Sequence, residues 1–232
     1  MGRLVYPTLA VAAGALLALT LYVVLFATPA EATLGVVQKI FYFHVPAAYA
    51  MYLGWAVCAV ASVVYLVRRG DGVDALARSS AEVALVFAAI VMISGPLWGR
   101  KSWGAYWTWD PRLTSTLLLT LIIAGYALLR ALGRGEPERR FAAALAILGA
   151  CVAPIIHVSV TQWRGQHPTV LGEAGGGIAP EMVLPFALGL VSFTIVFATL
   201  LATRYRLELA RRRLADLEER AAAAGIAIAE EP

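Results

Sequence analysis

The chain has 232 residues, of which 60% are apolar and 15% charged, and its mean hydropathy is +0.75. A soluble domain needs more polar surface than this, so the composition excludes an ordinary water-soluble fold and indicates lipid as the solvent. The net charge is only +4, and no basic patch indicates nucleic acid as a partner.

Six apolar runs lie between clusters of charge, and each is close to the length of about 20 residues that a helix needs to cross the hydrocarbon. We predict an all-α polytopic membrane protein, a bundle of six transmembrane helices at 1–203 followed by a cytoplasmic helical tail at 204–232. The first run is too long for a signal peptide, so we count it as a span. The predicted spans are 5–27, 46–67, 81–99, 113–130, 141–157 and 184–203.

Basic residues predict the orientation, because short loops rich in Lys and Arg stay in the cytoplasm. Six spans put both termini on one side, and 14 of the 19 Lys and Arg residues fall on that side. We therefore expect both termini in the cytoplasm of a bacterium, with the protein in the inner membrane and three loops facing the periplasm or the cell exterior. The tail continues the sixth span with an apolar stripe that includes Leu207, Leu214 and Leu217, and it is either a solvated extension or a helix that binds a partner.

The first external loop shows helical spacing. Leu34, Val37, Phe41 and His44 recur every three or four residues, so we predict an interfacial helix at 33–44 that lies on the membrane. Pro46 would then begin the second span, since proline favours the first position of a helix.

The second external loop, at 98–112, is rich in tryptophan. It holds Trp98, Trp103, Trp107 and Trp109 together with Tyr106. Aromatic belts scatter Trp singly at helix ends, whereas this cluster offers flat, rigid faces that suit a large planar apolar ligand. The basic residues that flank it could pair with carboxylates on the rim of such a ligand, as a porphyrin with two propionates would provide; they are Arg100, Lys101 and Arg112.

Asp110 precedes Pro111 at the start of the fourth span. This position predicts an N-cap, in which the carboxylate accepts hydrogen bonds from the first backbone amides of the helix. Capping the helix and orienting the Trp-rich loop are compatible roles for the same side chain.

All three histidines lie in the external loops or at their edge. His44 and His167 are beyond the apolar runs on the side of the Trp-rich loop, and two neutral imidazoles are the number that ligates a haem iron from opposite faces. His157 directly follows an apolar run, where a histidine more often bonds to a helix end than to a metal. Cys58 and Cys151 form no CxxC or CxxCH motif, so the chain cannot attach haem to itself covalently.

The segment from Trp103 to Asp110 resembles the WGxxWxWD signature of the WWD-domain haem-handling family, including Gly104 and with Tyr106 where relatives often have Trp. The six-span layout is similar to that of CcmC-type members, and so are the stretches 43–48 and 154–157. The resemblance implies that His44 and His167 are the axial ligands and that the Trp-rich loop binds the cofactor. The residues implied in that contact are Arg100, Trp103, Gly104, Tyr106, Trp107, Trp109, Asp110 and Arg112.

The same resemblance implies a haem chaperone for cytochrome c biogenesis rather than an enzyme. Such a protein holds haem b transiently and without a covalent bond, and presents it to a CcmE-like haem acceptor. It acts in the membrane beside a CcmD-like small membrane protein and CcmA/CcmB-like ABC subunits. The alternative is a permease that moves haem or another solute through its own bundle; the sequence weighs against it, because the predicted spans hold almost no ionisable residue besides Glu82. Assistance with covalent attachment of haem to the acceptor stays open, since positioning alone can accelerate a reaction.

Overall fold

The structure is a computed structural model, and it describes residues 5–133, 135–163, 165–168 and 177–225. Six stretches of this described part are long and apolar enough to cross a membrane, which confirms the predicted all-α bundle with six spans. The helices are α1 (Val5–Tyr22), α2 (Phe41–Arg68), α3 (Asp71–Trp103), α4 (Pro111–Leu132), α5 (Glu136–Ala150), α6 (Val152–Gln162) and α7 (Pro180–Ala223). A π-helical turn, η1 (Val23–Ala27), ends the first span, and a 3-10 turn, η2 (Val36–Ile40), leads into α2.

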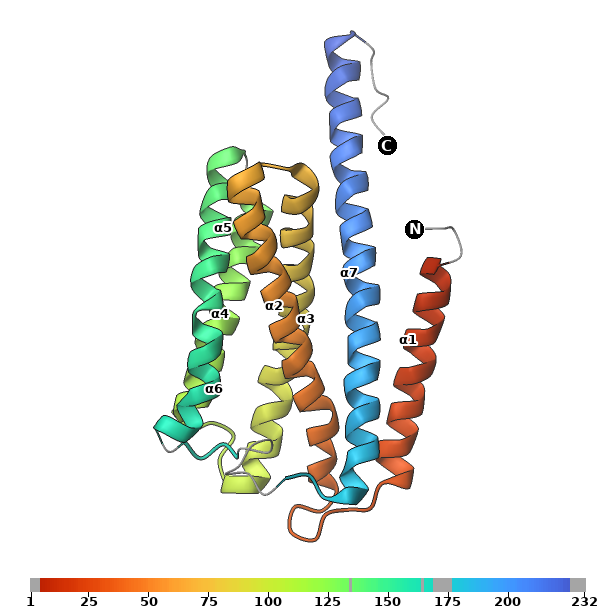
Figure 1. Ribbon diagram of the computed structural model, residues 1–232, viewed down its shortest axis with the longest axis vertical. Helices are drawn as coiled ribbons and strands as arrows, with labels where there is room; N and C mark the ends of the chain where they lie inside the picture. Colours follow the sequence, from red (N-terminus) through yellow and green to blue (C-terminus); the bar gives the residue numbers. More distant parts are fainter. Residues whose placement is uncertain (1–4, 134, 164, 169–176, 226–232) are drawn as a thin grey trace.

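Two helices form the centre of the bundle. α2 and α3 pack along each other, α4 and α5 cover one side of the pair, and α7 covers the other (Figure 1). α1 packs mainly against α7 at the edge of the molecule, where Thr20 Oγ1 and Ser192 Oγ share a hydrogen bond of 2.6 Å. Such small polar side chains can hold spanning helices together, because lipid provides no hydrophobic force between them.

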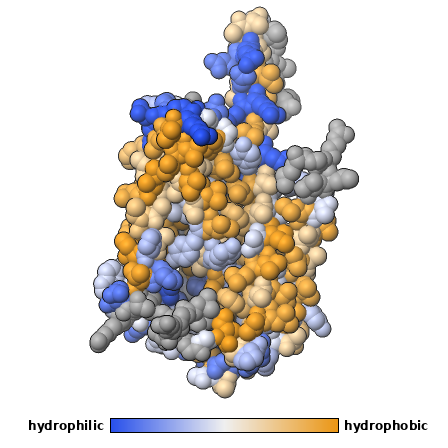
Figure 2. All heavy atoms as spheres, in the orientation of Figure 1, coloured by the Kyte–Doolittle hydropathy of each residue, from blue (hydrophilic) through white to orange (hydrophobic). Residues whose placement is uncertain are grey.

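The two ends of the bundle differ in chemistry. α1 begins and α7 ends on the same side, which we call the terminal end, and α7 projects beyond the bundle there (Figure 1). Figure 2 shows hydrophobic residues over the flank of the bundle and hydrophilic residues gathered at the terminal end. Buried ion pairs join helices at this end, for example Asp74 on α3 with Arg130 on α4 at 2.7 Å. We call the opposite end the histidine end, because His44 lies there at the start of α2.

The interfacial helix predicted at 33–44 is wrong. Residues 36–40 form the turn η2, which runs directly into α2, and Ile40 already has α-helical backbone angles. Pro46 therefore lies inside α2 rather than at its start. Proline cannot donate to the carbonyl four residues earlier, and this Tyr42 carbonyl faces α7 at Gly189, where a Cβ atom would lie only 2.7 Å from the oxygen. The bare glycine lets α7 approach α2 at this point.

Two predicted boundaries also change. α3 continues through Trp98 to Trp103, so the first half of the Trp-rich segment is helical and Gly104 ends the helix with a positive φ of 83°. The fifth span is divided at Cys151 into α5 and α6, and it extends through Gln162. The tail from Arg204 continues α7 without a break as far as Ala223, and its last residues, 226–232, lie outside the described part.

Candidate haem-binding site

The structure brings two of the three histidines together at the histidine end. The ring centres of His44 and His167 lie 6.5 Å apart, with an angle of 32° between the ring planes. His44 belongs to the first turn of α2, whereas His167 comes from the loop after α6, so residues 123 positions apart in sequence form the pair. His157 lies on α6 and makes no ring contact with either of them in the described part of the chain.

His44 rests against a short segment of α3. Its Nδ1 lies 2.9 Å from the Ser94 hydroxyl oxygen, and the Ser94 hydroxyl donates its own proton to the Ile90 carbonyl at 2.6 Å. Since this proton is used, the Ser94 oxygen accepts the bond from His44, which places the imidazole proton on Nδ1. The Nε2 atom then keeps its lone pair, as a metal ligand must.

The sequence reading missed this support. Gly95 follows Ser94, and a Cβ atom at Gly95 would lie 3.1 Å from Cε1 of His44, so the glycine makes room for the ring. Pro96 comes next, inside α3. A run of Ser, Gly and Pro in the interior of a predicted span is unusual, because glycine and proline both weaken a helix. This run was the feature of the sequence from which the contact with His44 could have been predicted.

His167 has three close neighbours. Its ring centre lies 6.4 Å from that of Trp98, its Nδ1 lies 3.2 Å from Arg112 Nη1, and the same Nδ1 lies 3.0 Å from the Pro168 carbonyl oxygen. Arginine only donates, so Nδ1 has two alternative roles: it accepts from Arg112 with the proton on Nε2, or it donates to the Pro168 carbonyl and leaves Nε2 unprotonated, as in His44. Ligation of a metal by Nε2 requires the second arrangement. Burial, and then the positive charge of Arg112, lower the pKa of His167 below its ordinary value of 6.5. The imidazole is therefore neutral at neutral pH.

Asp110 links this loop to the Trp-rich segment. One carboxylate oxygen caps α4 by accepting from the backbone amides of Arg112, at 2.8 Å, and Leu113. The other oxygen accepts from the backbone amide of Gln166, the residue before His167. Gly165 allows the close approach, since a Cβ atom there would lie 2.6 Å from that oxygen. The predicted cap is present, and the same buried side chain also holds the loop that carries His167.

The aromatic residues divide into two groups. Trp98 and Trp103 meet edge to face, with ring centres 5.5 Å apart, and Trp98 is the member that contacts His167. The Trp103 ring lies on the backbone of Gly99, where a Cβ atom would come within 2.6 Å of it. Trp107 and Trp109 form a separate edge-to-face pair at 5.8 Å, and no ring contact joins this pair to either histidine among the described residues.

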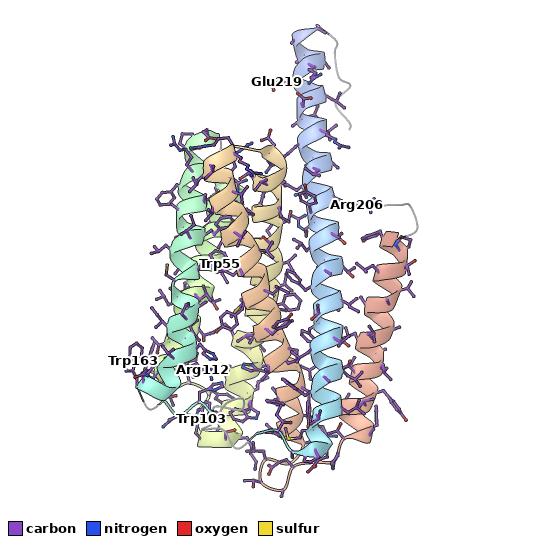
Figure 3. All side chains as sticks on the ribbon, viewed as in Figure 1. Trp55, Trp103, Arg112, Trp163, Arg206 and Glu219 are labelled. Atoms are coloured by element: carbon purple, nitrogen blue, oxygen red, sulfur yellow. The ribbon has the colours of Figure 1, made fainter. Side chains whose placement is uncertain are left out.

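The polar residues of the Trp-rich segment have distinct positions. Arg100 lies over the ring of Tyr106, 5.8 Å from its centre, and donates to the Gly104 carbonyl. Lys101 is exposed. Arg112 points toward His167, and Figure 3 shows it at the histidine end of the bundle. Trp98 also donates to the side-chain oxygen of Gln38 at 3.2 Å, a contact that the sequence reading did not anticipate.

The spacing of the two imidazoles fits one metal ion between them. Two imidazoles that ligate one iron from opposite sides, each through a nitrogen about 2 Å away, have ring centres about 6 Å apart. The observed separation is 6.5 Å. With an aromatic wall on one side and Arg112 beside it, the residues suit a planar iron-bearing ligand with acidic groups.

Comparison with known proteins identifies a consistent set of relatives. The family model described as Heme exporter protein C matches residues 1–220. A protein of that name from Bradyrhizobium diazoefficiens is 37% identical and covers 92% of this chain and 82% of its own length. One from Rhodobacter capsulatus is 35% identical, with coverage of 84% and 82%, and one from Escherichia coli K12 is 34% identical, with coverage of 77% and 73%.

Proposed function

Since the chain belongs to the Heme exporter protein C family, we propose that it is a membrane chaperone that holds haem between His44 and His167 and delivers it for cytochrome c maturation. The observation that carries this proposal is the histidine pair, whose ring centres are 6.5 Å apart and whose Nδ1 atoms each lie beside an acceptor oxygen. Binding of one iron by both Nε2 atoms would use the tautomer in which each Nδ1–H donates to its neighbouring oxygen. No protein nucleophile is needed, because binding and presentation are the whole task.

Haem is the cargo in this proposal, held without a covalent bond. Trp98 and Trp103 would support the porphyrin face next to His167, and Arg112 would pair with a propionate. Trp107 and Trp109 would extend the apolar surface outward. Trp109 is 77% exposed, and an exposed aromatic ring beside a bound ligand suits contact with a second protein.

We propose that this second protein is a CcmE-like haem acceptor, and that CcmD-like and CcmA/CcmB-like subunits assemble on the same membrane protein. The family name of the relatives, exporter protein C, supports a system with several components. The histidine end would face the periplasm, because most basic residues lie at the terminal end and short basic loops stay in the cytoplasm.

Absorption spectra of the purified chain and of single His→Ala variants test the proposal. We expect a haem Soret band for the wild type, and a changed iron coordination for His44→Ala and for His167→Ala. His157→Ala is the matched control, because His157 lies outside the pair, and it should keep the wild-type spectrum. A changed spectrum for His157→Ala together with a normal one for His167→Ala would overturn the assignment.

Replacement of a tryptophan tests the aromatic surface separately. Trp109→Ala should reduce haem retention, by roughly 1 kcal/mol for a lost aromatic contact, without loss of the folded protein, because an exposed ring contributes little to the bundle. Trp163→Ala is the control, since Trp163 is also exposed at this end but belongs to the end of α6. Unchanged haem content with loss of protein from the membrane would show that Trp109 is only an interfacial anchor.

A further inference from the structure

A cleft of about 330 Å³ adjoins the candidate haem site and extends from it toward the terminal end, within the bundle. Its lining residues come from α2, α4, α5 and α6: Tyr52, Trp55, Ala56, Arg112, Ala150, Ala153 and His157. Ala56 and His157 are exposed on the flank of the bundle, so the cleft is open sideways. Figure 3 shows Trp55 and Arg112 at successive levels in the space between α2 and the helices α5 and α6.

The break between α5 and α6 produces this opening. α5 packs against both α2 and α4, whereas α6 packs against α4 and scarcely touches α2. The chain turns at Cys151, and Pro154 follows in the first turn of α6. Because the fifth span moves away from α2 after Cys151, a gap forms between α2 and α6. The small side chains of Ala56 and Ala153 do not fill it.

The cleft reaches deep into the span. Trp55 and Ala56 lie 14 and 15 residues after Phe41, the start of α2, which at a rise of about 1.5 Å per residue is roughly 20 Å along the helix. The hydrocarbon of a bilayer is about 30 Å thick, so a ligand in the cleft would be in contact with acyl chains rather than with water. Tyr52 and Trp55 give it aromatic walls.

The charge in the cleft selects the ligand. Arg112 is the cation of the lining, and it forms no ion pair with a carboxylate of the described residues; its partners are His167 and the Pro168 carbonyl. His157 adds an imidazole that makes no side-chain hydrogen bond to a described residue. The Asp110 carboxylate interacts with Arg112 through its charge, but its oxygens already accept from backbone amides. A cation at the edge of the span that has no salt bridge in the described residues favours an anionic ligand, and aromatic walls favour a flat one.

We propose that the cleft is a lateral entrance through which haem, a flat amphiphile with two carboxylates, passes from the adjoining leaflet of the bilayer to the histidine pair. This inference rests on the proposed function. Arg112 is shared by the two places, since it lines the cleft and its Nη1 lies 3.2 Å from Nδ1 of His167. A propionate that meets Arg112 in the cleft is therefore already beside the axial ligand.

A bulky side chain in the entrance tests the inference. The full chain is reconstituted in vesicles and mixed with haem dissolved in a second population of phosphatidylcholine vesicles, and the rate of appearance of the Soret band is followed. Ala56→Trp should slow this loading by roughly fivefold or more, because access becomes the limiting step, while the final spectrum stays that of the wild type. Ala153→Phe is an independent second plug on the opposite wall, in case Ala56→Trp impairs folding.

Two controls separate the entrance from the site. Ala187→Trp makes the same change on the flank of α7, where Ala187 is exposed and far along the chain from the cleft, and should load at the wild-type rate. Haem supplied in water as a complex with serum albumin, without donor vesicles, should load the plugged variants at the wild-type rate.

The entrance is refuted if both plugged variants load from vesicles as fast as the wild type, or if the plugs slow loading from both sources equally. A wild-type chain that gives no Soret band from either source would instead refute the proposed function, and the entrance with it.

Discussion

Asp110 shows how one side chain can serve two parts of the site. Its two carboxylate oxygens have separate tasks, since one caps α4 and the other accepts from the backbone amide of Gln166, next to His167. A carboxylate can do both because each of its oxygens accepts hydrogen bonds. An amide has one acceptor oxygen and cannot.

The Asp110→Asn variant separates these tasks. Asparagine caps a helix nearly as well as aspartate, so thermal stability should stay close to that of the wild type, whereas Asp110→Ala should lose about 1 kcal/mol. In Asp110→Asn the side-chain NH2 group would face the Gln166 N–H. Because both groups are donors, no hydrogen bond forms between them, and the loop is no longer held in its position. We expect an altered haem spectrum for Asp110→Asn at nearly normal stability. A wild-type spectrum would mean that Asp110 is a cap alone.

The charge of Arg112 should set the pH range of haem ligation. Burial and Arg112 hold the pKa of His167 below 6.5, and only the neutral imidazole binds iron. Ligation by His167 is therefore present above its pKa and is lost as the pH falls through that lowered value, below 6.5.

Replacing Arg112 by Met removes the positive charge, so the pKa of His167 should rise and ligation should be lost at a higher pH than in the wild type. A pH titration of the haem spectrum measures the midpoint, which is independent of how much haem is retained. Arg100→Met is the matched control, because Arg100 contacts Tyr106 and Gly104 rather than a histidine. A midpoint that moves equally in both variants, or in neither, would contradict the expectation.

Among the helices, α3 contacts both members of the histidine pair. It presents Ser94 and Gly95 to His44, and Trp98, about one turn later, to His167; Trp103 follows near the end of the helix and packs against Trp98. The Ser94 oxygen accepts from His44 only because its own proton is donated to the Ile90 carbonyl within the same helix. Hydrogen bonding within α3 thus fixes the tautomer of His44 on the neighbouring helix α2.

Ser94→Ala should remove the acceptor that fixes the His44 imidazole. Loss of such a supporting hydrogen bond typically lowers the affinity of a metal site by about 10-fold to 100-fold. Haem titration followed by absorbance measures this, and Ser94→Thr should restore affinity, because threonine keeps the hydroxyl. Ser79→Ala is the control on the same helix, since the buried Ser79 hydroxyl has no partner in the described part. Equal affinity for Ser94→Ala and Ser79→Ala would assign no positioning role to Ser94.

In the whole molecule, the ion-pair network and the histidine pair lie at opposite ends of the bundle. Ion pairs at the terminal end join α3 to α4 and α7. Asp74 on α3 takes part in two of them, with Arg130 and with Arg212, each at 2.7 Å. The side chains of Asp74 and Arg130 are both only 4% exposed. The start of the tail belongs to this network, because Arg204 pairs with Glu82 and Arg212 with Asp74.

Asp74→Ala should therefore destabilise the fold by about 3–5 kcal/mol, because it leaves a buried guanidinium without its main partner. Asp216→Ala is the control. Asp216 pairs with Arg220 on the exposed part of α7, and such surface pairs contribute about 0.5 kcal/mol or less. Thermal unfolding in detergent compares the two. The haem spectrum of folded Asp74→Ala should match the wild type, and a changed spectrum would show that the two ends are coupled.

The sequence by itself determined the number of spans and the class of the protein. Runs of apolar residues near the length of a bilayer crossing predict spanning helices, because hydrocarbon leaves no other way to satisfy the backbone. The N-cap at Asp110 followed from the same local reasoning. The predicted helix boundaries were wrong in two places. α3 continues past its predicted end as far as Trp103, and the turn η2 runs directly into α2, so that Pro46 lies inside the helix.

Only the tertiary structure decided which residues meet. The contacts of His44 with His167 and Ser94, and of Asp110 with Gln166, join residues on different elements, 50 residues or more apart. The division of the tryptophans into two pairs, and the cleft between α2 and α6, arise in the same way. Spacing along a chain fixes which residues share a face of one helix, whereas contacts between elements depend on how the helices pack, and that is a property of all their side chains together.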